Sequence, residues 1–127
     1  MTLASAVTVK KLPESVSLGN ARELLREVSP LLTENQPRIV FDFTEVQHLD
    51  SAGIEMLLRC MEEAMKRKGD VKLAAISPRV AVILELTRVD RLFEIFENPS
   101  DAVESFHRFP VHAFSAAPGM KECGTAD

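Results

Sequence analysis

Apolar and polar side chains follow two different periods along this chain, and each change of period predicts a new element. From residue 7 to 12 they alternate, which is the two-residue period of a half-exposed strand. Apolar residues then recur every three or four positions, the spacing of an amphipathic helix that Ser17 is expected to cap. Pro30 removes one backbone donor, so we expect this helix to bend or end near Ser29.

The middle of the chain predicts a buried strand followed by a long helix. Residues 38–44 form a near-continuous apolar run, as expected for a strand that is covered on both faces. From Ser51 to about Lys68 the helical spacing returns, and Gly69 is a natural stop. The apolar stripe of this helix comprises Ile54, Leu57, Leu58, Met61 and Met65.

The second half of the chain repeats the alternation of strand and helix. Residues 71–76 and 94–97 read as strands, and each is followed by a polar residue and a proline, at 77–78 and 98–99, that predict a helix start. Strands that alternate with helices favour an open sheet with parallel crossovers. The fold expected is therefore α/β, a mixed and mostly parallel sheet of about four strands with about four helices.

Length and composition limit the possible classes of protein. The chain has 127 residues, enough for one domain, which we place at 1–109; residues 110–127 lose periodicity and are expected to form a disordered tail. The net charge of −4 comes without a basic cluster, so nucleic acid is not an expected partner. No apolar run is long enough for membrane insertion and no signal peptide is recognisable, so a cytoplasmic protein is expected.

Histidines and cysteines are scattered, without the spacing of metal ligands, and there is no phosphate-cradling or dinucleotide-binding motif. No metal or cofactor is therefore expected. His48 and Asp50 flank Ser51 closely, but a catalytic serine needs a base aimed at its hydroxyl and a third group that orients the base. Neighbours in one short loop seldom achieve this, so we do not expect an enzyme.

The most informative segment is His48-Leu49-Asp50-Ser51-Ala52-Gly53-Ile54, which joins the buried strand to the long helix. A serine at a helix start lies beside unpaired backbone N–H groups and the positive end of the helix dipole, which favour an oxygen or a phosphate. Taken alone, Ser51 is read as a plain N-cap residue. Gly53 permits close approach of another backbone or of a partner, and Ala52 keeps the site uncrowded.

These residues resemble the phosphorylation loop of the STAS family, the anti-sigma-factor antagonists. The resemblance extends over about residues 6–109, through three further stretches in the same order. They are Ile39-Val40-Phe41-Asp42-Phe43-Thr44, Ala75-Ile76-Ser77-Pro78, and Leu84-Glu85-Leu86-Thr87 leading into Asp90-Arg91-Leu92-Phe93.

The resemblance implies a protein that binds an anti-sigma factor, usually a serine kinase, and thereby frees a sigma factor. Phosphorylation of Ser51 by that kinase would end the binding, and a phosphatase is a further possible partner. The alternative is a STAS subunit that regulates a membrane transporter, such as a lipid-exporting ABC system, which would bind its partner constitutively. A nucleotide-binding domain is a third reading, against which the missing phosphate-cradling loop counts.

Two departures from the family pattern concern the N-terminal segment. Family members usually begin with a hairpin of two strands, whereas only residues 7–12 fit a strand here, so the strand pair is shortened. An edge left open in this way must be shielded or used in pairing, and an edge-strand dimer is one possibility. Glu14 and Ser17 also stand where the family tends to carry Gly and Asp.

A contact surface is expected around Ser51 because turns at the carboxyl ends of neighbouring parallel strands share one edge of the domain. Asp42 could face the same pocket as Asp50, although a lone carboxylate in an apolar strand is usually satisfied by backbone N–H groups. Met56 and Cys60 either widen the core face of the helix or form a contact edge beside Ser51 with Gly53. The full predicted surface comprises Asp42, Asp50, Ser51, Ala52, Gly53, Met56, Ser77 and Arg79.

Overall fold

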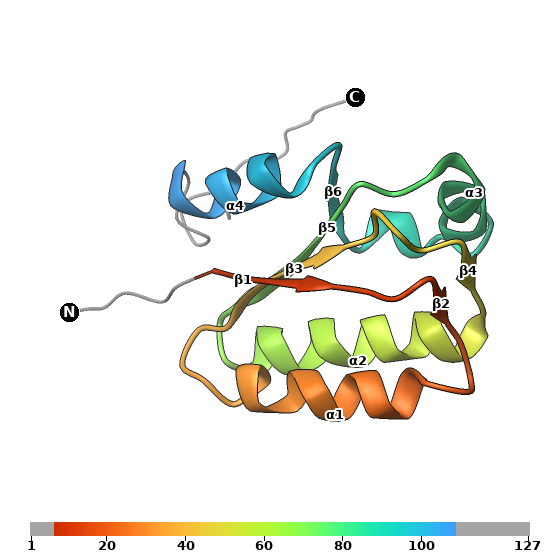
Figure 1. Cartoon of the computed structure of the whole chain (residues 1–127). Helices are drawn as coiled ribbons and strands as arrows, with labels where there is room; N and C mark the ends of the chain where they lie inside the picture. The colour runs from red at the N-terminus through yellow and green to blue at the C-terminus, as the bar shows by residue number, and fades with distance from the viewer. Residues whose placement is uncertain (1–6, 109–127) are drawn as a thin grey trace.

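One or two strands precede each α-helix along residues 7–108, the part of the chain that the computed structural model describes (Figure 1). In chain order they are β1 (Thr8–Lys11), β2 (Ser15–Val16), α1 (Ala21–Leu32), β3 (Arg38–Asp42), β4 (His48–Leu49), α2 (Ser51–Lys66), β5 (Asp70–Ala74), α3 (Pro78–Leu86), the 3-10 helix η1 (Val89–Arg91), β6 (Glu94–Phe96) and α4 (Pro99–Arg108). The main sheet has four strands in the order β1-β3-β5-β6, and each described pair is parallel. The predicted α/β class is confirmed. The predicted tail, residues 110–127, lies outside the described residues.

Helices cover both faces of the main sheet, with α1 and α2 on one face and α4 on the other (Figure 1). Side chains alternate between the two faces along each strand. In β3, Ile39 and Phe41 join the larger core with α1, α2 and α3, whereas Val40 joins a smaller core with Ala102 and Phe106 of α4. This two-sided covering explains why residues 38–44 read as a continuous apolar run.

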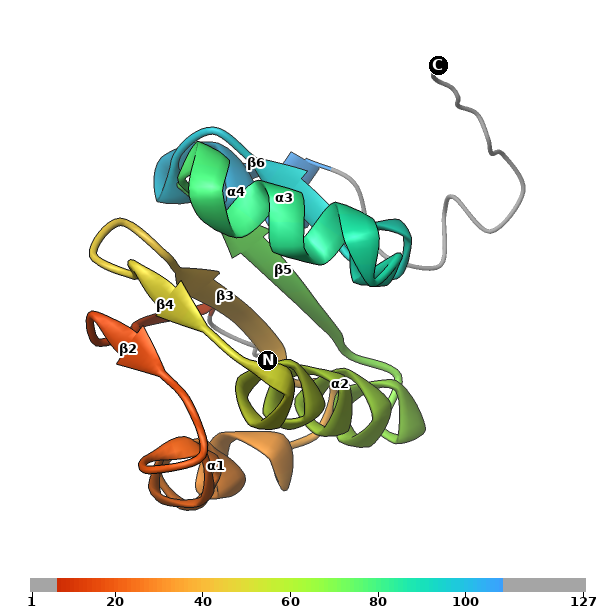
Figure 2. The same cartoon turned by 90° about the vertical axis from the view of Figure 1, so that its right-hand side faces the viewer.

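A second, two-stranded sheet pairs β2 with β4 in parallel, and Figure 2 shows the two strands side by side where α1 and α2 begin. The prediction of a single strand before the first helix was wrong, because Ser15 and Val16 pair with His48 and Leu49. A strand of two residues has no alternation of its own that could reveal it. Among the described residues β1 still pairs only with β3 and forms one edge of the main sheet.

Helix α1 differs from its prediction at both ends. It begins at Ala21 with Asn20 in the N-cap position, so Ser17 does not cap it; instead the Ser17 carbonyl accepts hydrogen bonds from the N–H groups of Asn20 and Ala21. The helix also continues through Pro30 to Leu32. The proline falls in the last turn, where only one intrahelical hydrogen bond is lost, and buried Leu32 holds the turn against the core.

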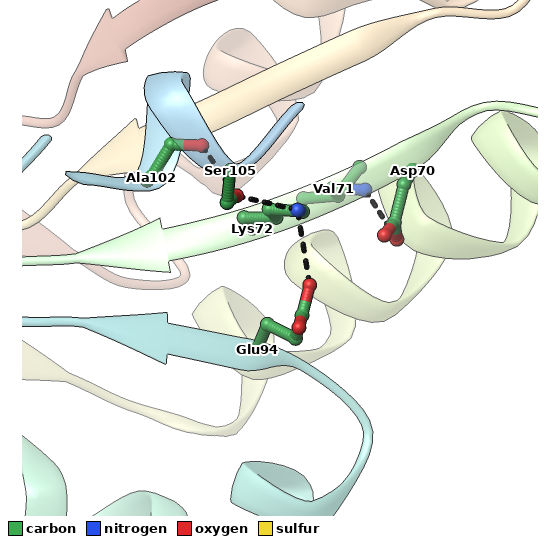
Figure 3. Close-up of polar contacts among 6 residues, drawn as sticks. All are labelled: Asp70, Val71, Lys72, Glu94, Ala102 and Ser105. Atoms are coloured by element: carbon green, nitrogen blue, oxygen red, sulfur yellow. Dashed lines mark hydrogen bonds and ion pairs between the residues drawn. The ribbon is translucent and has the colours of Figure 1, made fainter. Parts of the chain in front are cut away.

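A buried lysine fastens α4 to the sheet (Figure 3). Lys72 of β5 is only 5% exposed, and its Nζ donates to Ser105 Oγ at 2.6 Å and lies 3.0 Å from Glu94 Oε1. The same ammonium lies 4.2 Å from the ring centroid of Phe106, a favourable cation–π distance. The charge is thus paired with groups from β6 and α4, as a buried charge requires.

Candidate functional site

The start of α2 is organised by Asp50 rather than by Ser51. Asp50 has extended backbone angles, and its Oδ1 accepts a hydrogen bond of 3.0 Å from the N–H of Gly53. Asp50 is therefore the N-cap residue of α2, and Ser51 is the first residue inside the helix. The reading of Ser51 as the capping residue was wrong, because the aspartate before it already supplies the capping oxygen.

The other carboxylate oxygen of Asp50 fixes a second loop. Oδ2 accepts a hydrogen bond of 3.0 Å from the N–H of Leu18, in the connection between β2 and α1. The N–H groups of Gly53 and then of Leu18 stabilise the ionised carboxylate and lower the pKa of Asp50 below its ordinary value. A full negative charge therefore stands next to Ser51 at neutral pH, and it ties the two loops together.

The Ser51 side chain is exposed, and its hydroxyl takes part in no hydrogen bond among residues 7–108. The helix dipole places a partial positive charge at this end of α2. The hydroxyl is thus free, accessible and located where an added anionic group finds backbone donors nearby. Chemically this suits a phosphoacceptor.

Gly53 brings β2 and α2 into close contact. A Cβ atom at this position would lie 2.4 Å from the Val16 carbonyl oxygen and 2.8 Å from Leu49 Cδ1. The close approach that the sequence predicted for Gly53 is therefore made by another backbone of the same chain. Gly53 is itself buried, so it supports the loop from beneath.

The predicted contact edge of Gly53, Met56 and Cys60 was wrong, because all three are buried. Met56 is 3% exposed and Cys60 is fully buried, both within the larger core. Burial raises the pKa of the Cys60 thiol to about 12. Conversely Met65, which the apolar stripe placed inside, is 62% exposed near the end of α2.

A groove between α1 and α2 lies beside the start of α2, and the sequence did not predict it. Its volume is about 650 Å³, and Leu18 at its end is 81% exposed. A leucine followed by glycine at a predicted helix start was the one available signal. The groove is lined by Leu18, Gly19, Ala21, Arg22, Leu25, Ala52, Glu55, Met56 and Arg59.

The sequence of the chain matches the family model of the STAS domain over residues 3–102. The chain belongs to the STAS domain family.

Proteins similar to this STAS domain include some that are named as anti-sigma factor antagonists. BtrV of Bordetella bronchiseptica, named as a candidate anti-sigma factor antagonist, is 22% identical over 91 residues, which cover 72% of this chain and 78% of BtrV. The crystal structure of a candidate anti-sigma factor antagonist from Thermotoga maritima has a TM-score of 0.72 and 22% identity, covering 79% of this chain and 88% of that one. The unphosphorylated form of the anti-sigma factor antagonist SpoIIAA has a TM-score of 0.70 and 16% identity, covering 85% and 95%.

The same fold occurs in transport proteins. A sulfate transporter family protein from Wolinella succinogenes has a TM-score of 0.65 and 17% identity, covering 85% of this chain and 89% of that chain. At these identities the structural matches establish the fold alone. None of the helices between residues 7 and 108 is long and apolar enough to cross a membrane.

The remaining predicted contact residues of the STAS domain lie on other turns. The Asp42 carboxylate accepts hydrogen bonds from the N–H and the hydroxyl of Thr44, so it stabilises its own turn, and no described contact joins it to Asp50. Ser77 caps α3 by accepting from the N–H of Val80 at 3.3 Å, as predicted, and Arg79 is exposed in the first turn of that helix. Within the described residues no cluster of histidine, cysteine and carboxylate side chains could hold a metal ion.

Proposed function

We propose that this protein is an anti-sigma factor antagonist whose partner binding is controlled by phosphorylation of Ser51. The observation that carries the proposal is the exposed, unengaged Ser51 hydroxyl, held at the first position of α2 by the Asp50 cap. The relatives named as anti-sigma factor antagonists support an anti-sigma factor as the partner. In its unphosphorylated form the protein would bind that factor and free a sigma factor.

The switch follows from charge. A phosphate on Ser51 adds about −1.5 to −2 charges beside the ionised Asp50 carboxylate. In the free protein, water and the N–H groups at the start of α2 can solvate these charges. In a complex the same charges would lose water at the centre of the contact, next to a like charge, and binding would weaken.

The partner implied by this switch is an anti-sigma factor with serine kinase activity. It would transfer phosphate to Ser51, and a phosphatase would restore the binding form. The protein itself would act by binding and not by catalysis, and would work in the cytoplasm, where sigma factors act.

The alternative is a constitutive regulatory subunit of a membrane transporter. The fold shared with the Wolinella succinogenes sulfate transporter family protein favours it as the second candidate. Such a subunit would not need a charge switch at Ser51.

Binding assays on Ser51 variants separate the two functions. The protein and its Ser51→Ala and Ser51→Asp variants are used to capture partners from the native cell, and the captured protein is then purified and titrated. We expect Ser51→Ala to bind like the parent and Ser51→Asp to bind more weakly. Ser100→Asp is the matched control, because Ser100 is an exposed serine in the first turn of α4. Equal binding by all variants would contradict the switch and favour the transporter subunit.

A further inference from the structure

The lining of the groove between α1 and α2 combines apolar side chains with two arginines. Leu18 and Leu25 provide apolar surface from the α1 side, and Met56 of α2, although only 3% exposed, is also part of the lining. The volume of about 650 Å³ falls within the ordinary range for binding sites. A groove of this kind between two helices suits the apolar side chains of a partner segment.

The two arginines of the groove have no partner within the described part of the chain. Arg22 of α1 and Arg59 of α2 are exposed and line the groove, but neither forms an ion pair or a side-chain hydrogen bond there. Among the lining side chains the two arginines outnumber the single carboxylate, Glu55, although the net charge of the chain is −4. Free guanidinium groups are well suited to bind carboxylates.

We propose that this groove binds an acidic, amphipathic segment of the partner protein. Its apolar side chains would pack on Leu18 and Leu25, and its Asp or Glu side chains would pair with Arg22 and Arg59. A second copy of this chain is a poorer occupant, because a symmetric contact through the groove would bring the same arginines together. The proposal rests on the proposed function and adds the chemistry of the partner.

The position of the groove also couples it to the switch. Ala52 and Glu55 line the groove, so one end of it reaches the residue that follows Ser51 and the next turn of α2. The Leu18 end is held by the hydrogen bond from its N–H to Asp50. A phosphate on Ser51 would therefore repel the carboxylates of a bound segment, and the parent protein should bind an acidic segment better than its phosphorylated form.

Selection from a random peptide library tests the groove without knowledge of the natural partner. A phage-displayed dodecapeptide library is panned on the full chain, and the most enriched peptide is synthesised with a fluorophore. We expect enriched peptides to combine Asp or Glu with Leu, Ile, Met or Phe. In fluorescence polarisation, the variants Arg22→Glu, Arg59→Glu and Leu18→Asp should each weaken peptide binding about tenfold or more. A tenfold change corresponds to about 1.4 kcal/mol of binding free energy.

The matched control is Arg26→Glu, which makes the same charge change one turn further along α1, outside the groove lining. It should weaken binding only about threefold or less, because exposed charges away from the contact are screened by salt. Melting curves confirm that each variant is folded. Enrichment of basic peptides, no enrichment, or equal effects of Arg22→Glu and Arg26→Glu would overturn the proposal.

The failure of this proposal differs from a failure of the proposed function. If Ser51→Asp weakens binding of the captured partner but Arg22→Glu and Arg59→Glu do not, the switch stands and the groove is not the binding surface. If acidic peptides bind through the groove but the captured partner binds the Ser51→Asp variant as tightly as the parent, the groove stands and the switch fails.

Discussion

Replacing Gly53 by alanine tests the packing that positions Ser51 at the start of α2. A Cβ atom would lie 2.4 Å from the Val16 carbonyl oxygen, 2.8 Å from Leu49 Cδ1 and 2.9 Å from Val16 Cγ1. The nearest of these atoms is backbone, so relief requires β2 itself to move. The Val16 carbonyl also accepts a hydrogen bond from the N–H of Asp50, so a movement of β2 disturbs the cap that precedes Ser51.

The magnitude follows from two opposing effects. Overpacking a buried site costs about 1–3 kcal/mol, and the backbone clash places Gly53→Ala at the upper end. Alanine is the better helix former by up to about 1 kcal/mol, which offsets part of the cost. The net loss of unfolding free energy is about 2 kcal/mol, which lowers the melting temperature of a domain of this size by roughly 8 °C.

Thermal melts followed by circular dichroism measure the effect, and Gly19→Ala is the matched control. At Gly19 the nearest heavy atom to an added Cβ is Ser17 Oγ at 3.9 Å, so the substitution meets open space. This control should change the stability by about 0.5 kcal/mol or less. Equal melting temperatures for the two variants would refute the close contact between β2 and α2.

Three further predictions concern groups whose surroundings the structure defines. Met56→Lys should lower the free energy of unfolding by about 3 kcal/mol or more, because it buries an unpaired charge, whereas the same change at exposed Met65 should have little effect in urea titrations. Burial raises the pKa of Asp70, so ionisation of its carboxyl destabilises the fold as pH rises. Asp70→Asn should therefore raise the melting temperature at pH 7. This increase in melting temperature should vanish below the ordinary pKa of 3.8. A higher melting temperature of Asp70→Asn that persists below pH 3.8 would contradict this explanation. With Cys123 replaced by serine, the Cys60 thiol, whose pKa is raised to about 12, should resist iodoacetamide at pH 8 until the chain is unfolded in guanidinium. Rapid modification of the folded protein would contradict its burial.

Periodicity predicted most of the fold, because burial on one face leaves a direct trace in the sequence. The long strand β3 and the helices α2 and α3 were placed within a few residues of their observed positions. The two-residue strand β2 was missed, since its existence depends on pairing with β4 and not on local pattern. The burial of Lys72 could not be predicted from the sequence around it, because its partners Glu94 and Ser105 come from elements later in the chain.

The sequence predicted which residues form the candidate site better than it predicted how they are arranged. The sequence identified Ser51 and Asp50, but their roles at the helix start depend on backbone angles that residue types alone leave open. Met56 is polarisable and unbranched, which suits both a core and a contact surface, and only the tertiary packing of the larger core decides that it is buried. The exposure of Leu18 could not be predicted, because the loop that carries it is held by a hydrogen bond to Asp50, which lies 32 positions away in the sequence.

Mapping the phosphate is the most direct test of the central claim. The full chain is incubated with ATP and the serine kinase captured from its native cell, and tandem mass spectrometry then locates the modification. One phosphate on Ser51, absent from the Ser51→Ala variant, is the expected result. Phosphate on Ser77 or Ser100 alone, or none on a protein that binds the kinase, would contradict it.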